Sequence, residues 1–399
     1  MRSPPIAFNL ILLFTIGPLT AHAQYRELQD FSLAQIYGGV VLDGSGNIYG
    51  AIAGDQTDQG EVFEIAMPGD TLNILHTFNG SPDGAEPYGP LVFDRAGNLY
   101  GTTNVGGAHN AGTVFIMSPA SGGQWRERVL YSFTGGADGA NPQSGVFLDN
   151  SGHLYGTTTT GGTYGQGVVY RVSLAGVPLE TALHSFGSSG DGVNPTGSVV
   201  ADASGNLYGT TYAGGAYGYG TVYELSPPVN GSGWTETVLH SFPGGEDDGL
   251  NPTGGLVLSP YGYLIGAAEH GGQVSLQCQS GNCGALFRLV QEPGFGWVEG
   301  AFVFFETYPG ANPIGPVKLQ STTGVTENIY FSVLTGGNGT GAVMDAIPIE
   351  YGRWLAFPLA DLPNDLYLQS NGGLAQDRQG NLYGTYNSDH HSAVYEVTP

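Results

Sequence analysis

The sequence predicts an all-β protein, a seven-bladed β-propeller made of four-stranded antiparallel blades. Two observations support this prediction. The phrase GNLYGTT at residues 97–103 returns six times, once unchanged and five times as a variant, and successive copies start 51 to 65 residues apart, a period typical of propeller blades. In addition, the two ends of the chain carry complementary parts of one repeat, as a closed ring requires.

Each repeat contains four apolar segments of strand length. In residues 145–186 they are GVFLDNSG, HLYGTTTTGG, GVVYRVS and ETALHSF, in that order. Apolar and polar residues alternate in GTVYEL at 220–225 and in TVLHSF at 237–242, which is typical of half-buried antiparallel strands. No window sustains a helical period, so we expect very little helix.

The first two strands of a repeat are joined by an Asp-x-x-Gly turn. This motif begins at Asp43, Asp94, Asp202 and Asp377. The Asp carboxylate can accept backbone N–H bonds and the Gly can take a positive φ, so the motif predicts a tight hairpin. A calcium loop would need more ligands. The glycine after the Tyr of the phrase, as in Gly101, Gly156 and Gly209, predicts a close approach of neighbouring backbone.

The fourth strand of a repeat carries recurring aromatic residues. Four repeats start this strand with a tryptophan, namely Trp125, Trp234, Trp297 and Trp354. Their common place in the repeat favours packing between adjacent blades over sugar stacking. Three histidines share one later position with Tyr131, namely His76, His184 and His240. We therefore interpret them as strand side chains, not as catalysts.

The ends of the chain predict how the ring closes. Residues 392–399 match the third strand of a repeat, and residues 25–31 resemble a fourth strand. We expect one propeller domain over residues 24–399, whose last blade is shared between residues 25–33 and 372–399. A solenoid with the same strands is the alternative, but it would need polar caps at its two ends.

Residues 1–23 have the features of a cleavable export signal. They contain an early cation at Arg2, an apolar run from Ile6 to Ile16 and the segment Ala21-His22-Ala23. The alternative is a retained anchor, although the run is shorter than the ~20 residues that span a bilayer. The sequence therefore predicts a secreted protein, extracellular or periplasmic, with no membrane span in the mature chain.

The composition limits the partners. The chain has 34 acidic and 10 basic residues, a net charge of −24, which argues against nucleic acid and anionic membranes. We expect a monomer that meets a glycan or a protein surface outside the cell. Its only two cysteines, Cys278 and Cys283, predict a disulfide in an exported chain.

The motifs GNLYGTTxxGG, GTVF, LHSF and DGxNPxGGLVxD resemble the GloVer, or Gloeo_Verruco, repeat of secreted bacterial proteins. This resemblance implies an export signal, tandem repeats with a propeller form and, in many members, a C-terminal anchoring segment. Here no apolar tail precedes Pro399 and the sixth repeat is degenerate, which favours release over anchoring.

Two repeated motifs are expected on one face of the ring. They are TTxxGG, between the second and third strands, and DGxNP, between the fourth strand and the next first strand. The candidate binding residues are Asp83, Asp138, Asn141, Asp191, Asn194, Asp248 and Asn251. Such a ring of carboxylates and amides can hold calcium or hydrogen-bond a glycan, although ordinary turns use the same residues.

The last repeat contains a weak candidate metal site at Asp389, His390 and His391. No cofactor other than calcium is expected, and no catalytic residue is assigned, because no Ser, His and Asp set departs from the repeat and G-x-S-x-G is absent.

The leading functional hypothesis is a secreted binding or scaffold propeller that recognises a glycan or a protein surface through its loop-rich face. The second is an extracellular glycosidase or lyase with acidic residues in the central channel. The third is a purely structural component of the envelope.

Overall fold

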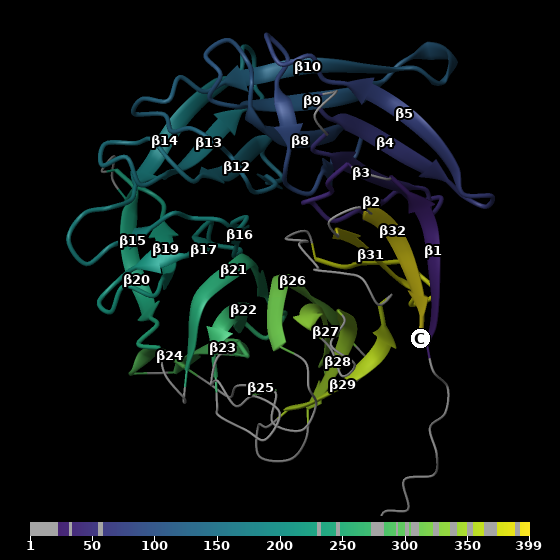
Figure 1. Ribbon diagram of the computed structural model, residues 1–399. Coiled ribbons are helices and arrows are strands. Elements are labelled where there is room, and N and C mark those ends of the chain that lie inside the picture. The colour runs from purple at the N-terminus through teal and green to yellow at the C-terminus, as the bar shows by residue number, and fades with distance from the viewer. Residues whose placement is uncertain are drawn as a thin grey trace, which may run out of the picture.

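The computed structural model shows a ring of seven antiparallel sheets (Figure 1). It describes residues 23–31, 34–54, 59–229, 233–244, 248–272, 283–292, 294–299, 303–304, 311–321, 327–335, 341–348, 354–362, 373–387 and 392–399. Among these residues the only helix is the 3-10 turn η1 (Ser121–Gly123). The all-β, seven-bladed prediction is confirmed.

The first four blades follow one another along the chain. Blade 1 contains β2 (Val41–Leu42), β3 (Ile48–Ile52), β4 (Glu61–Ala66) and β5 (Thr71–Thr77). Blade 2 contains β6 (Ala85–Pro87), β7 (Val92–Phe93), β8 (Leu99–Val105), β9 (Thr113–Pro119) and β10 (Trp125–Ser132). Blade 3 contains β11 (Phe147–Leu148), β12 (His153–Thr158), β13 (Val168–Ser173) and β14 (Leu179–Ser185). Blade 4 contains β16 (Val200–Ala201), β17 (Leu207–Thr211), β19 (Thr221–Ser226) and β20 (Thr235–Ser241), and the short pair β15 (Gly192–Val193) and β18 (Ala213–Gly214) lies beside it.

The last three blades complete the ring. Blade 5 contains β21 (Gly249–Leu258), β22 (Leu264–Gly271), β23 (Ala285–Glu292), β24 (Gly296–Glu299) and β25 (Val303–Phe304). Blade 6 contains β26 (Ala311–Ser321), β27 (Glu327–Thr335), β28 (Ala342–Pro348) and β29 (Trp354–Asp361). Blade 7 contains β30 (Ala375–Gln376), β31 (Leu382–Asn387), β32 (Ser392–Thr398) and β1 (Gln24–Asp30).

The ring closes through the first and last strands, as the sequence predicts. Strand β1 pairs antiparallel with β32 and supplies the outer strand of blade 7. Arg26 binds Glu396 of β32 through Nε and Nη2, at 2.9 and 2.7 Å, and its Nη1 lies 2.6 Å from Asp70 of blade 1. The N-terminal strand therefore joins blade 7 to blade 1.

The Leu and the Tyr of the repeated phrase each have a structural role inside the blade. The Leu is fully buried at Leu99, Leu154 and Leu382. The Tyr hydroxyl donates to the Asp of the preceding turn, as Tyr100 does to Asp94 at 3.0 Å. Other Tyr–Asp pairs of this kind are Tyr49–Asp43, Tyr155–Asp149, Tyr208–Asp202 and Tyr383–Asp377.

The glycine of the phrase corrects one expectation. A Cβ on Gly209 would lie 2.3 Å from the Tyr223 hydroxyl oxygen, and one on Gly101 would lie 2.6 Å from the Phe115 ring. The close neighbour is thus an aromatic side chain of the third strand, whereas the sequence suggested neighbouring backbone. Any larger residue would have to displace a fully buried ring.

The Asp-x-x-Gly motif forms the predicted hairpin turn. Asp94 Oδ1 accepts bonds from the backbone N–H groups of Ala96 and Asn98, at 2.8 and 2.9 Å, and its Oδ2 accepts one from Asn98 Nδ2 at 2.7 Å. These bonds lower the pKa of Asp94 even though burial opposes them. Both oxygens of the Asp94 carboxylate therefore accept hydrogen bonds from residues of the same turn.

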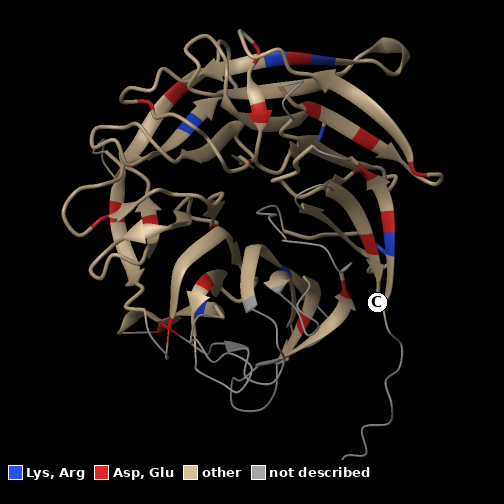
Figure 2. Ribbon diagram, in the orientation of Figure 1, with Lys and Arg blue, Asp and Glu red and all other residues tan. Residues whose placement is uncertain are grey.

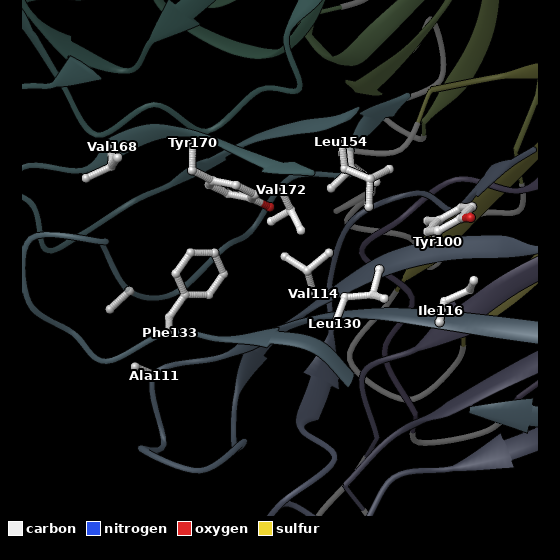
Figure 3. Packing of buried hydrophobic residues seen from close by; sticks show 12 residues of the cluster. Tyr100, Ala111, Val114, Ile116, Leu130, Phe133, Leu154, Val168, Tyr170 and Val172 are labelled. Carbon is white, nitrogen blue, oxygen red and sulfur yellow. The ribbon is translucent and has the colours of Figure 1, made fainter. Parts of the chain in front are cut away.

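Adjacent blades pack through their facing apolar sides. Between blades 2 and 3, Phe133 lies against Tyr170 at 4.9 Å between ring centroids, and Val114 and Leu154 belong to the same buried cluster (Figure 3). The predicted role of the tryptophans is confirmed at three of them, since each meets the phrase Tyr of the preceding blade. These pairs are Trp125–Tyr49, Trp234–Tyr155 and Trp297–Tyr208. The side chain of Trp354 lies outside the described residues.

The blades also meet at the axis of the ring, where glycines allow backbone contact. A Cβ on Gly89 would lie 2.1 Å from Gly145 N, and one on Gly197 would lie 2.1 Å from Gly254 O. The first Thr of the TT pair reinforces these contacts by donating to a carbonyl of the next blade. Such bonds are Thr102 to Ser144, Thr157 to Gly197, Thr210 to Gly254 and Thr385 to Gly38.

Some expectations fall on residues that the structure does not describe. Of the predicted export signal, residues 1–23, only residue 23 is described, and Cys278 is outside the described set. Within that set no helix is long and apolar enough to cross a membrane. The signal and the Cys278–Cys283 bridge stay predictions.

Candidate functional site

The two repeated loop motifs lie on one face of the ring, as expected. In five blades, the segment before or at the start of the first strand pairs with the segment at or just after the end of the second strand. These pairs are Ala85–Val105, Ala140–Thr160, Gly192–Gly214, Gly249–Gly271 and Ala311–Thr335. The face is therefore built from paired backbone, which holds the loops of each blade in register.

Each of the four candidate aspartates contacts a histidine or tyrosine near the end of the outer strand that precedes it in the chain. The distances to Oδ2 are 3.2 Å for His76–Asp83, 2.9 Å for Tyr131–Asp138, 3.0 Å for His184–Asp191 and 3.1 Å for His240–Asp248. The other oxygen accepts a backbone N–H, for example Gly192 N to Asp191 at 2.7 Å. These contacts fasten the loop to its blade.

The candidate asparagines connect neighbouring blades. Asn141, Asn194 and Asn251 have φ of 57°, 56° and 54°, in the left-handed region that Asn tolerates better than most residues. Their Nδ2 atoms donate to carbonyls of the preceding blade, at Asn104, Thr159 and Tyr212 respectively. Asn312 makes the same link to Glu269 in the degenerate repeat, which shows that the link does not need the Asp.

The sequence analysis missed a set of glutamates on the outer strands. Glu127, Glu180, Glu236 and Glu299 occupy one repeat position, and each interacts electrostatically with the candidate Asp of the preceding blade. Burial raises the pKa of Glu127 and Glu180 to about 7, and the neighbouring Asp adds to the shift. A signal was present, because Glu stands four residues before Tyr131, His184 and His240.

Few nearby charges stabilise these glutamates, namely Arg128 beside Glu127, His184 beside Glu236 and His240 beside Glu299. An oxygen of Glu127, Glu180 and Glu236 is buried and accepts no hydrogen bond. Acidic positions recur on the outer strands around the ring, whereas Lys and Arg are few (Figure 2). The boundaries between blades 1 to 5 thus carry closely spaced acids with little compensating charge.

At the boundary of blades 4 and 5, a histidine, an aspartate and a glutamate lie close together. His240 Nε2 lies 3.1 Å from Asp248 Oδ2 and 3.6 Å from Glu299 Oε1. The three side chains line a groove of about 700 Å3, together with Tyr217 from the loop after β17. Burial raises the pKa of Glu299 to about 7. Burial lowers the pKa of His240, but Asp248 and Glu299 outweigh it and the net shift is upward.

A second, much smaller cavity, of about 20 Å3, lies near the axis of the ring. The rings of Tyr37 and Tyr88 stack beside it at 4.2 Å. None of the described residues that line this cavity is a carboxylate or a histidine. Glu86 interacts electrostatically with both of these tyrosines.

The repeat sequence matches one known family. The model of the Gloeobacter/Verrucomicrobia repeat matches residues 12–127 and 122–344, most of the chain. The chain belongs to the Gloeobacter/Verrucomicrobia repeat family. This finding confirms the resemblance drawn from its motifs. No curated protein matches the chain in sequence.

Solved structures resemble this repeat protein at low identity. An ancestral GH74 enzyme is 12% identical over 92% of this chain and 48% of its own, with a TM-score of 0.57. A gluconolactonase from Xanthomonas campestris is 12% identical over 94% of this chain and 89% of its own, with a TM-score of 0.46. At such identities the likeness concerns the fold alone.

One candidate site of the repeat protein cannot be placed. Asp389, His390 and His391 lie outside the described residues, so the metal site predicted there stays a prediction. The same is true of calcium binding by the DGxNP aspartates, whose oxygens are used within their own blades.

Proposed function

We propose that this protein is a secreted binding propeller that recognises a glycan through its loop-rich face. The observation that carries the proposal is a row of exposed aromatic rings in the loops after the second strands. His109, Tyr164 and Tyr217 occupy one repeat position in blades 2, 3 and 4. All three are exposed, with 54% of Tyr164 and 61% of Tyr217 accessible to solvent.

A glycan fits this row better than an apolar protein surface does. Exposed aromatic rings next to hydrogen-bonding groups suit sugars, whose rings present C–H faces between hydroxyls. Tyr217 borders the groove that contains His240, Asp248 and Glu299, which supplies both donors and acceptors. The net charge of −24 favours a neutral or cationic glycan over an anionic one.

The proposed setting is outside the cytoplasm. Export by residues 1–23, a Cys278–Cys283 bridge and a monomeric state form one consistent picture, because disulfides persist in oxidising compartments. The mature protein is either released or held in the periplasm. Mass mapping of unreduced peptides tests the bridge.

The rival functions are supported less well. An enzyme of the glycosidase or lyase class needs a pair of acidic residues that face each other across the substrate, and the residues that line the small cavity at the axis are glycine, proline, tyrosine, serine, threonine and glutamine. A purely structural envelope component needs no exposed aromatic row. The glycan proposal accounts for this row.

A glycan array tests the proposal with a matched control. The double variant Tyr164→Ala, Tyr217→Ala should bind the recognised glycan roughly fivefold more weakly or worse, since each stacked ring contributes ~0.5–1.5 kcal/mol. The control is Tyr261→Ala, because Tyr261 is 57% exposed but lies in the turn between first and second strands, on the opposite face.

Unchanged binding by Tyr261→Ala together with weakened binding by the double variant would support the proposal. Binding to no glycan, or equal losses in both variants, would overturn it.

A further inference from the structure

We propose that His240, Asp248 and Glu299 form a binding site for a zinc-like divalent cation at the outer boundary of blades 4 and 5. The proposal concerns the metal alone and does not depend on glycan recognition. Among the described residues, this is the one group of three or more His, Cys, Asp or Glu whose ligand atoms all lie within 4.8 Å of one another.

The distances suit a tetrahedral metal. Zinc binds nitrogen and carboxylate oxygen at ~2.0–2.2 Å, so two ligand atoms of a tetrahedral site lie about 3.4 Å apart. The observed separations from His240 Nε2, 3.1 Å to Asp248 and 3.6 Å to Glu299, lie on either side of that value. Both separations from His240 are therefore compatible with a tetrahedral cation, and all three ligand atoms lie within 4.8 Å of one another.

The chemistry of the ligands selects the cation. One imidazole and two carboxylates are a donor set that zinc accepts, whereas calcium prefers six to eight oxygen atoms. The groove beside the cluster leaves room for a water molecule as the fourth ligand. Exposed fractions of 17%, 6% and 27% for the side chains of His240, Asp248 and Glu299 give a site that is partly buried yet open to solvent.

The charges of the cluster favour a cation. Within the described part of the chain, the ion-pair partner of both Asp248 and Glu299 is His240. One imidazolium offsets at most one of two carboxylates. A divalent cation would neutralise the charge of both carboxylates.

The other blades provide an internal comparison. His184 binds Asp191 at 3.0 Å and Glu236 stands nearby, in the same repeat positions as the proposed ligands. There the carboxylate of Glu236 does not join the His–Asp pair. One difference is visible in the sequence, because His240 and Asp248 are eight residues apart while His184 and Asp191 are seven apart.

Equilibrium dialysis of the metal-stripped protein against zinc chloride tests the proposal. We expect the wild-type protein to bind zinc at this site, and Glu299→Gln and His240→Ala to weaken that binding at least tenfold. The matched variants Glu236→Gln and His184→Ala should bind as the wild type does. Circular dichroism establishes that each variant is folded.

A second measurement covers the case in which His240→Ala fails to fold. Zinc should raise the melting temperature of the wild type and of Glu236→Gln, because a ligand that binds the native state stabilises it, but not that of Glu299→Gln. Absence of zinc binding by the wild type, or equal losses in the matched variants, would overturn the proposal.

Discussion

Single residues in this ring have roles set by contacts between blades. Glu180 of blade 3 is half-buried, its Oε1 accepts no hydrogen bond, and Asp138 of blade 2 acts on it electrostatically. Burial, with Asp138 adding to it, raises the pKa of Glu180 to about 7. Such a carboxyl opposes folding whenever it is ionised, so the outer rim of the ring is sensitive to pH.

Replacement of Glu180 by Gln tests this sensitivity. In the unfolded chain Glu loses its proton near pH 4.3, whereas in the folded protein Glu180 keeps it up to about pH 7. The folded state binds more protons within that window, so stability falls as pH rises through it. Glu180→Gln removes this loss and should be more stable than the wild type by about 1–2 kcal/mol at pH 8 and equal to it at pH 4.

Urea unfolding at both pH values provides the measurement. The exposed Glu292→Gln is the control for removal of one charge. A gain that is the same at pH 4 and pH 8 would show that Glu180 does not retain its proton in the folded protein.

At the scale of elements, the loops are structural before they are functional. Asn251 donates from its backbone N–H to Tyr219 O and from Nδ2 to Tyr212 O, each at 2.9 Å. Both acceptors belong to the loop of the preceding blade. The loop that enters blade 5 is thus fixed to blade 4, next to the groove.

The variant Asn251→Ala should lower the free energy of unfolding by about 2 kcal/mol. It removes a hydrogen bond worth ~1 kcal/mol. It also places alanine at a positive φ, which alanine tolerates less well than Asn does, and this costs a further ~1 kcal/mol. Asn251→Gly keeps the backbone relaxed and should lose about half as much. Thermal or urea unfolding of both variants measures these losses. Unchanged stability in both variants would contradict a structural role for Asn251 and would favour a role in ligand binding.

The sequence predicts the elements well because their signals are local. The Asp-x-x-Gly turn, the buried Leu of the phrase and the alternating strands each lie within a few residues, so pattern and turn chemistry suffice. The glutamates escaped notice because Glu299 meets Asp248 across a blade boundary, 51 positions away. Contacts of this kind depend on how two neighbouring sheets pack, and the periodicity of the sequence does not indicate that packing.

At the scale of the whole molecule, each blade packs only against its neighbours. The ring has no free ends because β1 pairs with β32 and Arg26 reaches blade 1. Loss of this closure would expose the outer edge of β32 and remove Leu28 from a buried cluster with Val394. An open edge of that kind invites association. The loop-rich face and its grooves keep their geometry only while the ring is closed.

Deletion of residues 24–30, which form β1, tests the closed ring most directly. The control deletes residues 274–280, seven residues of the longest second-to-third-strand segment, and a reductant is present in both cases. We predict that the first deletion lowers the melting temperature by more than 10 °C and causes aggregation, whereas the control stays close to the full protein. Small and equal effects of the two deletions would contradict a ring sealed by its N-terminal strand.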